Sequence, residues 1–129
     1  MHDDFDMLAF VSRHKPPVLE FDAGETVFLK GDSAERLFVV DAGRVDILMF
    51  GRVLERIGPG GLFGEMALID DRSRSAAALT LERCRVHAID KPTFLKLVGA
   101  DPRFALHVID IMTKRLTRIA AMREATAKR

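Results

Sequence analysis

Only one cysteine, Cys84, occurs among the 129 residues, which excludes a disulfide framework within the chain and any all-cysteine zinc or iron–sulfur site. Tryptophan and tyrosine are absent, so neither ring type is available to stack on a ligand. No apolar run approaches the ~20 residues of a membrane span. Residues 1–4 are acidic, where a signal peptide would be basic. These absences predict a cytoplasmic protein that does not enter a membrane.

The chain also lacks an excess of charge of either sign. Lysine and arginine number 20, aspartate and glutamate number 19, and the net charge is +1. Attraction to phosphate over the whole surface, as in many nucleic-acid binders, is therefore not expected. Hydrophobic residues make up 48% and charged residues 30% of the chain, which is typical of a globular protein. The length predicts a single domain over 1–129.

Glycine is concentrated in the first half of the chain, where eight of the nine glycines fall between Gly24 and Gly64. Short β-rich runs lie between them, at 26–29, 36–40, 44–49 and 52–57. Short strands at intervals of roughly 8–12 residues, joined by glycine turns, predict a β sandwich, roll or barrel.

Two strand connections are predicted in more detail. The short link Phe50-Gly51 indicates a hairpin over 44–57. A strand pair, or one long bent strand, is expected over 75–89. There Val86 and Ala88 alternate with polar neighbours, which fits a strand with one buried face.

Both ends of the chain are predicted to be helical. A short helix over 4–13 ends before Pro16-Pro17. A second helix over 91–98 has Pro92 near its first turn and is expected to close at Gly99. Asp101 then caps a longer helix that starts at Pro102 and runs to about residue 125.

This last helix carries two overlapping apolar stripes. One is expected to face the β part and comprises Phe104, Val108, Ile111 and Met112. The other has the 3-4-3-4 spacing of a short coiled coil and comprises Ile109, Met112, Leu116, Ile119 and Arg123. The second stripe predicts a parallel homodimer formed through this helix.

The most informative stretch runs from Gly58 to Ala76. A glycine-rich turn leads into Phe63-Gly64-Glu65, and a short apolar turn follows over 66–69. After a polar loop, Arg74-Ser75-Ala76 begins a strand, and eight residues separate Glu65 from Arg74.

This pattern resembles the phosphate-binding cassette of cyclic-nucleotide-binding domains. That family includes the sensor halves of catabolite activator proteins, the regulatory subunits of cyclic-AMP-dependent kinases, and nucleotide-gated channels. The turns at 24–25 and 30–32 and the run 37–43 also stand where the family keeps its early β-roll turns. The resemblance covers about residues 15–125. It implies a mainly β α+β fold: a double-stranded β-helix (a jelly-roll-like β-roll) over about 17–90, a short N-terminal helix, and two C-terminal helices over about 91–125.

The residue types suit a cyclic nucleotide. Arg74 carries a planar fork of donors that fits two phosphate oxygens, and Glu65 would accept a hydrogen bond from the ribose 2′-hydroxyl. Gly64 lets the backbone approach the sugar. The small Ala67 lets its backbone N–H, at the start of a turn, approach the phosphate. Ser75 adds a hydroxyl for the phosphate or for a guanine amino group.

The expected ligand-binding residues come from this motif and from one earlier strand. They are Phe63, Gly64, Glu65, Met66, Ala67, Arg74, Ser75, Ala76, Ile47 and Met49. By resemblance, Ile47 and Met49 face the base, although their shared orientation also fits ordinary core packing. Arg72 is a rival phosphate ligand, disfavoured because Ser-Ala does not follow it. The family's lid over the base comes from the last helix, where Ile119, Met122 or Arg123 could serve.

Elsewhere the sequence points to ordinary roles. His14, His87 and His107 are expected to be solvated or to cap helices. Cys84 is interpreted as a half-buried strand residue, with a mildly activated thiol as the alternative. The basic residues of the C-terminal helix are expected on a solvated face: Lys114, Arg115, Arg118, Arg123, Lys128 and Arg129.

The favoured function is a stand-alone receptor for a cyclic mononucleotide, cAMP first and cGMP second, which signals through an unknown effector protein or through dimerisation. Few residues follow the last helix, so no DNA-binding domain is expected. The alternative is a β-roll interaction or dimerisation domain without ligand; a buried Arg74 lacking an anion argues against it. No enzyme and no metal are expected. A metal-dependent β-roll enzyme needs clustered histidines, and none of the four lies within 15–86, although His14 and His87 flank that range.

Overall fold

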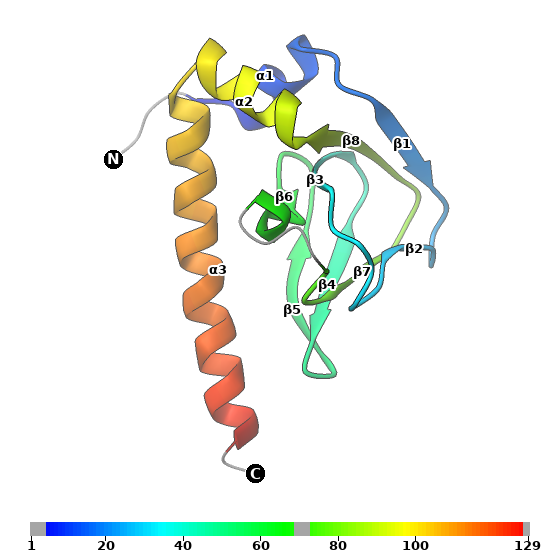
Figure 1. Cartoon of the computed structure of the whole chain (residues 1–129). Coiled ribbons are helices and arrows are strands. Elements are labelled where there is room, and N and C mark those ends of the chain that lie inside the picture. The colour runs from blue at the N-terminus through cyan, green and yellow to red at the C-terminus, as the bar shows by residue number, and fades with distance from the viewer. Residues whose placement is uncertain (1–4, 69–72, 128–129) are drawn as a thin grey trace.

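The structure is a computed structural model that describes residues 5–68 and 73–127. Within them the chain forms eight strands in two four-stranded antiparallel sheets, which pack as a β-roll (Figure 1). One sheet has the order β1 (Val18–Phe21), β8 (Cys84–Asp90), β3 (Arg36–Ala42) and β6 (Leu62–Phe63). The other has the order β2 (Thr26–Phe28), β7 (Ala77–Thr80), β4 (Val45–Met49) and β5 (Arg52–Ile57). The predicted mainly β α+β fold is confirmed, with one short helix before the roll and two helices after it.

The hairpin predicted over 44–57 is formed by β4 and β5, whose register pairs Val45 with Ile57 and Met49 with Arg52. The connecting residues Phe50 and Gly51 have positive φ values of 56° and 72°. Two successive left-handed residues are typical of a type I′ turn, which matches the twist of paired strands.

The region 75–89 contains two strands, and they belong to different sheets. β7 pairs with β2 and β4, whereas β8 pairs with β1 and β3. The short segment 81–83 therefore carries the chain from one sheet to the other. This resolves the choice between a strand pair and one bent strand in favour of the pair.

Two hydrophobic cores result, because β3 and β8 are buried on both faces. Phe38 and Val86 belong to the core between the sheets, whereas Leu37 and Ile89 belong to the core beneath the helices. The prediction of a single buried face on β8 was wrong, since His87 is also buried, at 6% exposure. The helices cover the outer face of this sheet, and period-two alternation cannot report such a cover.

The first two helices depart from their predicted bounds at one end each: α1 (Met7–Arg13) begins three residues later than predicted, and α2 (Lys91–Ala100) ends two residues later. α1 has Asp6 as its N-cap, and α2 has Asp90 as its N-cap. Gly99 does not close α2 as predicted. The helix continues to Ala100 and ends at Asp101, whose φ of −154° and ψ of 106° are extended. The reason is Pro102, because the residue before a proline disfavours the helical conformation.

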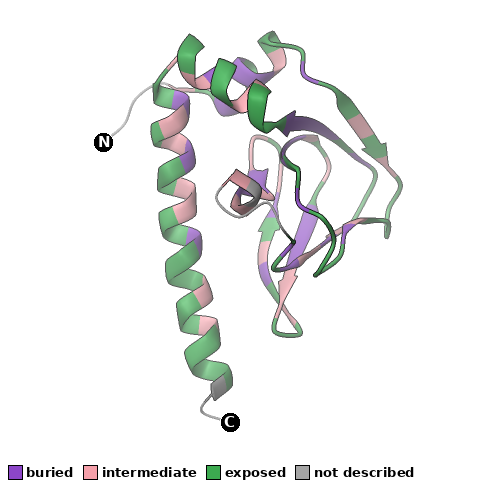
Figure 2. Cartoon of the chain, viewed as in Figure 1, coloured by how far each residue is buried: buried purple, intermediate pink, exposed green. Residues whose placement is uncertain are grey.

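The last helix, α3 (Arg103–Ala127), lies alongside the roll (Figure 1). Its buried residues recur on the side that faces the roll, and most of its remaining surface is exposed (Figure 2). Phe104 and Val108 are buried there as predicted, with Ile111 and Met112 partly buried against the same core. No helix within the described residues is long and apolar enough to cross a membrane.

Candidate functional site

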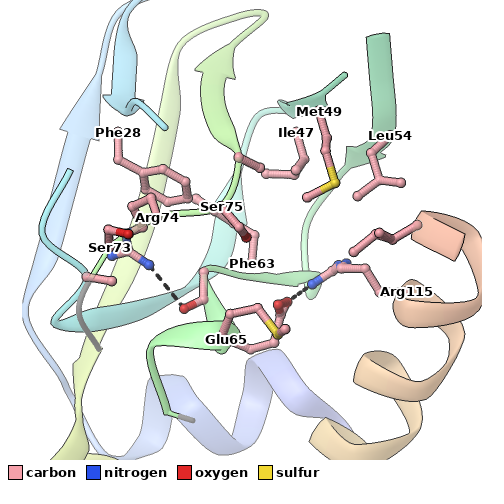
Figure 3. Close-up of a pocket in the computed structure, with 15 residues that line it drawn as sticks. Phe28, Ile47, Met49, Leu54, Phe63, Glu65, Ser73, Arg74, Ser75 and Arg115 are labelled. Carbon is pink, nitrogen blue, oxygen red and sulfur yellow. Dashed lines mark hydrogen bonds and ion pairs between the residues drawn. The ribbon is translucent and has the colours of Figure 1, made fainter. Parts of the chain in front are cut away.

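Two segments that are separated in sequence meet at one cavity (Figure 3). The first follows β6, where Gly64 has a φ of +78° and leads into the 3-10 helix η1 (Glu65–Leu68). The second is the run from Ser73 to Ala76, which precedes β7. The lining comprises Phe28, Ala34, Ile47, Met49, Leu54, Phe63, Gly64, Glu65, Met66, Ser73, Arg74, Ser75, Ala76, Arg115 and Ile119. All the predicted site residues except Ala67 are in this set, and Ala67 lies on η1 beside them. Arg72, the rival phosphate ligand, lies outside the described residues.

Arg74 is a buried cation without a carboxylate partner among the described residues. It is 8% exposed. Its guanidinium donates to the carbonyl oxygens of Gly64 at 3.1 Å and of Arg36 at 2.7 Å, while its buried Nε has no hydrogen-bond acceptor within the described residues. Burial lowers the pKa of Arg74 and the nearby charge of Arg36 lowers it further, while the charge of Asp32 opposes both by a smaller amount. This site therefore favours an added negative charge.

The surroundings hold Arg74 in place from two sides. Its guanidinium carbon lies 4.2 Å from the centre of the Phe28 ring, close enough for a cation–π interaction. Its backbone N–H donates to the Asp32 carbonyl at 2.8 Å, and its own carbonyl accepts from Gly31 at 2.9 Å. The Gly31-Asp32 turn noted in the sequence thus positions the arginine.

Glu65 is also buried, and its partner comes from α3. Arg115 donates through Nη1 to Glu65 Oε1 (Figure 3), and through Nη2 to the carbonyl of Leu62 at 2.8 Å. Its Nε donates at 2.9 Å to Glu55 on β5, which also accepts from Arg118 at 2.8 Å. These contacts tie the middle of α3 to the roll next to the cavity.

The prediction that Arg115 lies on a solvated face was wrong, because the residue is 6% exposed. Arg115 follows Phe104, Val108 and Ile111 at helical spacing, so it continues the stripe that faces the roll. That position in the stripe was a usable signal. Sequence reasoning did not place Arg115 in the core because a charged residue is rarely buried unless it is paired, and the sequence does not show the partner.

A larger outer pocket adjoins the cavity. The inner cavity has a volume of about 40 Å³, and the outer pocket, of about 570 Å³, is lined by residues of the β4–β5 hairpin and α3. Both are lined by Met49, Met66, Ser75 and Ile119. Of the three lid candidates, Ile119 lines both spaces and Arg123 lines the outer one. Met122 packs against the core between the sheets.

The histidines and the cysteine singled out in the sequence have structural roles, and the predicted exposure of His87 and of Cys84 is corrected. His87 is buried, not solvated, with Nε2 at 3.3 Å from the Ser12 hydroxyl and 3.4 Å from Asp41. Cys84 is 1% exposed, and burial raises its thiol pKa, which is the opposite of activation. His14 caps the end of α1. No cluster of three or more potential metal ligands occurs among the described residues.

Comparison with known proteins agrees with this geometry. Residues 18–101 match the family described as "Cyclic nucleotide-binding domain", and the chain belongs to that family. The chain is 32% identical over 101 residues to the "Cyclic AMP receptor protein" of Thermus thermophilus; the match covers 74% of this chain and 47% of that protein. The chain therefore spans about half the length of that relative.

Solved structures show the same fold. The catabolite activator protein of Thermus thermophilus superposes with a TM-score of 0.77 at 27% identity, covering 92% of this chain and 57% of that one. A structure titled "A cyclic-GMP-dependent signalling pathway regulates bacterial phytopathogenesis" gives a TM-score of 0.71 at 32% identity, covering 85% and 90%. The family resemblance inferred from the Gly64-Glu65 and Arg74-Ser75-Ala76 motifs is confirmed.

Proposed function

We propose that this chain is a receptor domain for a purine 3′,5′-cyclic mononucleotide. The cyclic phosphate lies at Arg74, the ribose 2′-hydroxyl at Glu65, and the base extends past Met49 toward α3. The observation that carries the proposal is the state of Arg74: a buried guanidinium whose hydrogen bonds go only to carbonyl oxygens and whose Nε has no acceptor among the described residues. A buried charge left without a partner is costly, and a phosphate diester supplies the missing anion and acceptors.

Glu65 complements this arrangement on the sugar side. Arg115 engages its Oε1, and a carboxylate has a second oxygen with acceptor capacity of its own. Glu65 can therefore accept from a ribose hydroxyl while it stays paired with α3. Glu65 is 3% exposed, so a hydrogen bond there forms away from competing water.

The proposal includes the partners expected from the sequence. The domain is a regulatory module, with cytoplasmic location and without catalysis or metal, that signals to an effector protein or through a parallel homodimer. Among the described residues of α3, the exposed large apolar side chains are Leu106, Ile109 and Leu116, at 54%, 57% and 47% exposure. Met112 and Ile119, which were assigned to the dimer seam, pack against the roll instead. The proposed seam is therefore the stripe formed by Leu106, Ile109 and Leu116.

The second candidate is an interaction domain that no longer binds a nucleotide. One observation favours it: Glu65 already has a cationic partner in Arg115. Arg74 has no comparable partner among the described residues, so the two candidates differ in what Arg74 does.

Titration calorimetry on nucleotide-stripped protein separates the two candidates. Wild type is expected to bind cAMP or cGMP, and Arg74→Ala to weaken binding by roughly 2–5 kcal/mol, the range for removing one partner of a buried charge pair. Arg85→Ala is the matched control, because Arg85 is an exposed arginine that pairs with Glu20 and Asp41 on the surface. Circular dichroism checks that each variant is folded. Wild-type protein that binds neither nucleotide, or a folded Arg74→Ala variant that binds as tightly as wild type, would contradict the proposal.

A further inference from the structure

The outer pocket is where a base lies if the phosphate and the ribose occupy the inner cavity. The inner cavity holds Arg74 and Glu65, the groups assigned to the phosphate and the ribose. The adjoining outer pocket is about 570 Å³ and shares Met49 and Ile119 with the inner cavity. If the proposed function holds, the purine extends into this outer pocket.

The polar side chains of the outer pocket are almost all donors. Its walls are apolar where Leu48, Phe50 and Leu116 line it, and its cationic side chains are Lys30 and Arg123. An ammonium and a guanidinium have N–H donors and no acceptor. Ser75 supplies a hydroxyl, and no described lining residue of this pocket carries a carboxylate or a carboxamide.

The two common purines present different edges to such a pocket. Guanine offers two adjacent acceptors, N7 and O6, whereas adenine offers the N7 acceptor beside an N6 amino donor. A guanidinium pairs with N7 and O6 through two hydrogen bonds. An adenine in the same place would set its amino group against the donors of Lys30 and Arg123.

We propose that the outer pocket selects guanine over adenine, so that cGMP is the preferred ligand and Arg123, supported by Lys30, reads the N7–O6 edge. The inference rests on the proposed function and adds a preference for one base, which the phosphate-binding cassette does not determine. Arg74 and Glu65 contact phosphate and ribose, which cAMP and cGMP share. The cassette motif therefore predicts a cyclic nucleotide but does not distinguish adenine from guanine.

The test compares four ligands by calorimetry on the nucleotide-stripped 129-residue chain: cGMP, cAMP, cyclic IMP and a cyclic dinucleotide. Cyclic IMP keeps N7 and O6 but lacks the guanine 2-amino group, so it isolates the edge assigned to Arg123. We expect cGMP and cyclic IMP to bind at least about fivefold more tightly than cAMP, the lower end for one bidentate contact. Binding of cAMP as tight as that of cGMP overturns the inference and leaves the proposed function intact. Binding of none of the four overturns both.

Substitutions then assign the preference to a residue. Arg123→Met keeps an unbranched, flexible side chain but removes the guanidinium donors, so it should reduce cGMP and cyclic IMP affinity about fivefold or more and leave cAMP nearly unchanged. Lys114→Met is the matched control, because Lys114 is a 71%-exposed cation of the same helix that pairs with Asp110. An unchanged cGMP preference in Arg123→Met overturns the assignment. A cyclic dinucleotide that binds more tightly than cGMP also overturns it, since the two cations would then serve a second phosphate.

Discussion

Glu65 and Arg74 show how two single residues with opposite charges can be buried in one cavity in different states. Glu65 is paired with Arg115, whereas among the residues that the structure describes Arg74 donates only to carbonyl oxygens. The difference depends on the groups that contact each side chain. Arg115 of α3 is a cation next to Glu65, whereas Arg74 contacts backbone carbonyls and the Phe28 ring of the roll. The same cavity therefore has one satisfied charge and one that gains from an added anion.

Glu65→Gln tests the sugar contact at this scale. A neutral amide is a weaker acceptor than a carboxylate, so the variant should lose more affinity for the ribonucleotide than for its 2′-deoxy counterpart, which has no hydroxyl to donate. Calorimetry with both ligands measures the two losses.

Glu82→Gln is the control for that experiment. It makes the same change at a 57%-exposed glutamate that pairs with Arg44 and does not line the cavity, so it should keep the preference for the ribonucleotide. Equal losses for the two ligands in Glu65→Gln would mean that Glu65 shapes the loop and does not contact the sugar.

Among the elements, α2 and α3 differ in what attaches them to the roll. α3 is attached by buried contacts, with Phe104 and Val108 in the core and Arg115 in the charged cluster. α2 contributes Leu97 to the core and depends at its start on Asp90, whose Oδ1 accepts from the Thr93 N–H at 2.9 Å. A capping carboxylate of this kind is sensitive to pH.

The Asp90 cap makes part of the stability depend on pH. Hydrogen bonds from the side chain and the backbone of Thr93 lower the pKa of Asp90. A lowered folded-state pKa means that the cap contributes fully above the unfolded value of about 3.9 and that this contribution is lost as pH falls through the folded value. Asp90→Ala should therefore lower Tm at pH 7 and have less effect below about pH 3.

Thermal melts at several pH values measure this difference. Asp90→Asn serves as the control, because asparagine retains a capping oxygen but does not titrate. Its Tm difference from Asp90→Ala should be nearly constant with pH. An Asp90→Ala effect of the same size at pH 2.5 and pH 7 would contradict the assignment.

For the molecule as a whole, the surface feature that bears on association is the outer stripe of α3. Leu106, Ile109 and Leu116 are each about half exposed and follow one another at the intervals of a coiled-coil seam, with Thr113 between the last two. Leu116 also lines the outer pocket. A partner helix packed on this stripe would touch the wall of the ligand site, which is how binding and association could be linked reciprocally.

Sedimentation velocity with and without cGMP or cAMP tests the proposed dimer. Wild type should form a weak dimer, since pairing removes the stripe from water at roughly 25 cal/mol per Å² of apolar surface. Leu106→Glu/Ile109→Glu should be monomeric and still bind ligand, because neither residue lines the pocket.

Ala121→Glu introduces the same charge at an exposed position of α3 outside the proposed seam and should leave the dimer intact. A wild type that stays monomeric at high concentration in both states would refute the dimer. A dimer whose dissociation constant does not change when ligand is added would refute only the coupling.

The sequence alone determined the class of fold and most of the cavity. Glycine turns and short β-rich runs predict the strands because turn geometry is local, as the positive φ of Gly51 and Gly64 shows. The Gly64-Glu65 and Arg74-Ser75-Ala76 motifs predict the lining because the two segments flank one short loop, so few arrangements of the chain separate them.

Only the tertiary structure decided which residues from distant segments complete the site. Arg115 reaches Glu65 across 50 residues of sequence, and His87 is buried because helices cover the outer face of β8. Exposure of a charged side chain depends on the partner opposite it, and that partner is set by packing between elements. Periodicity assigns a residue to a face of its own helix or strand; it does not say what lies against that face.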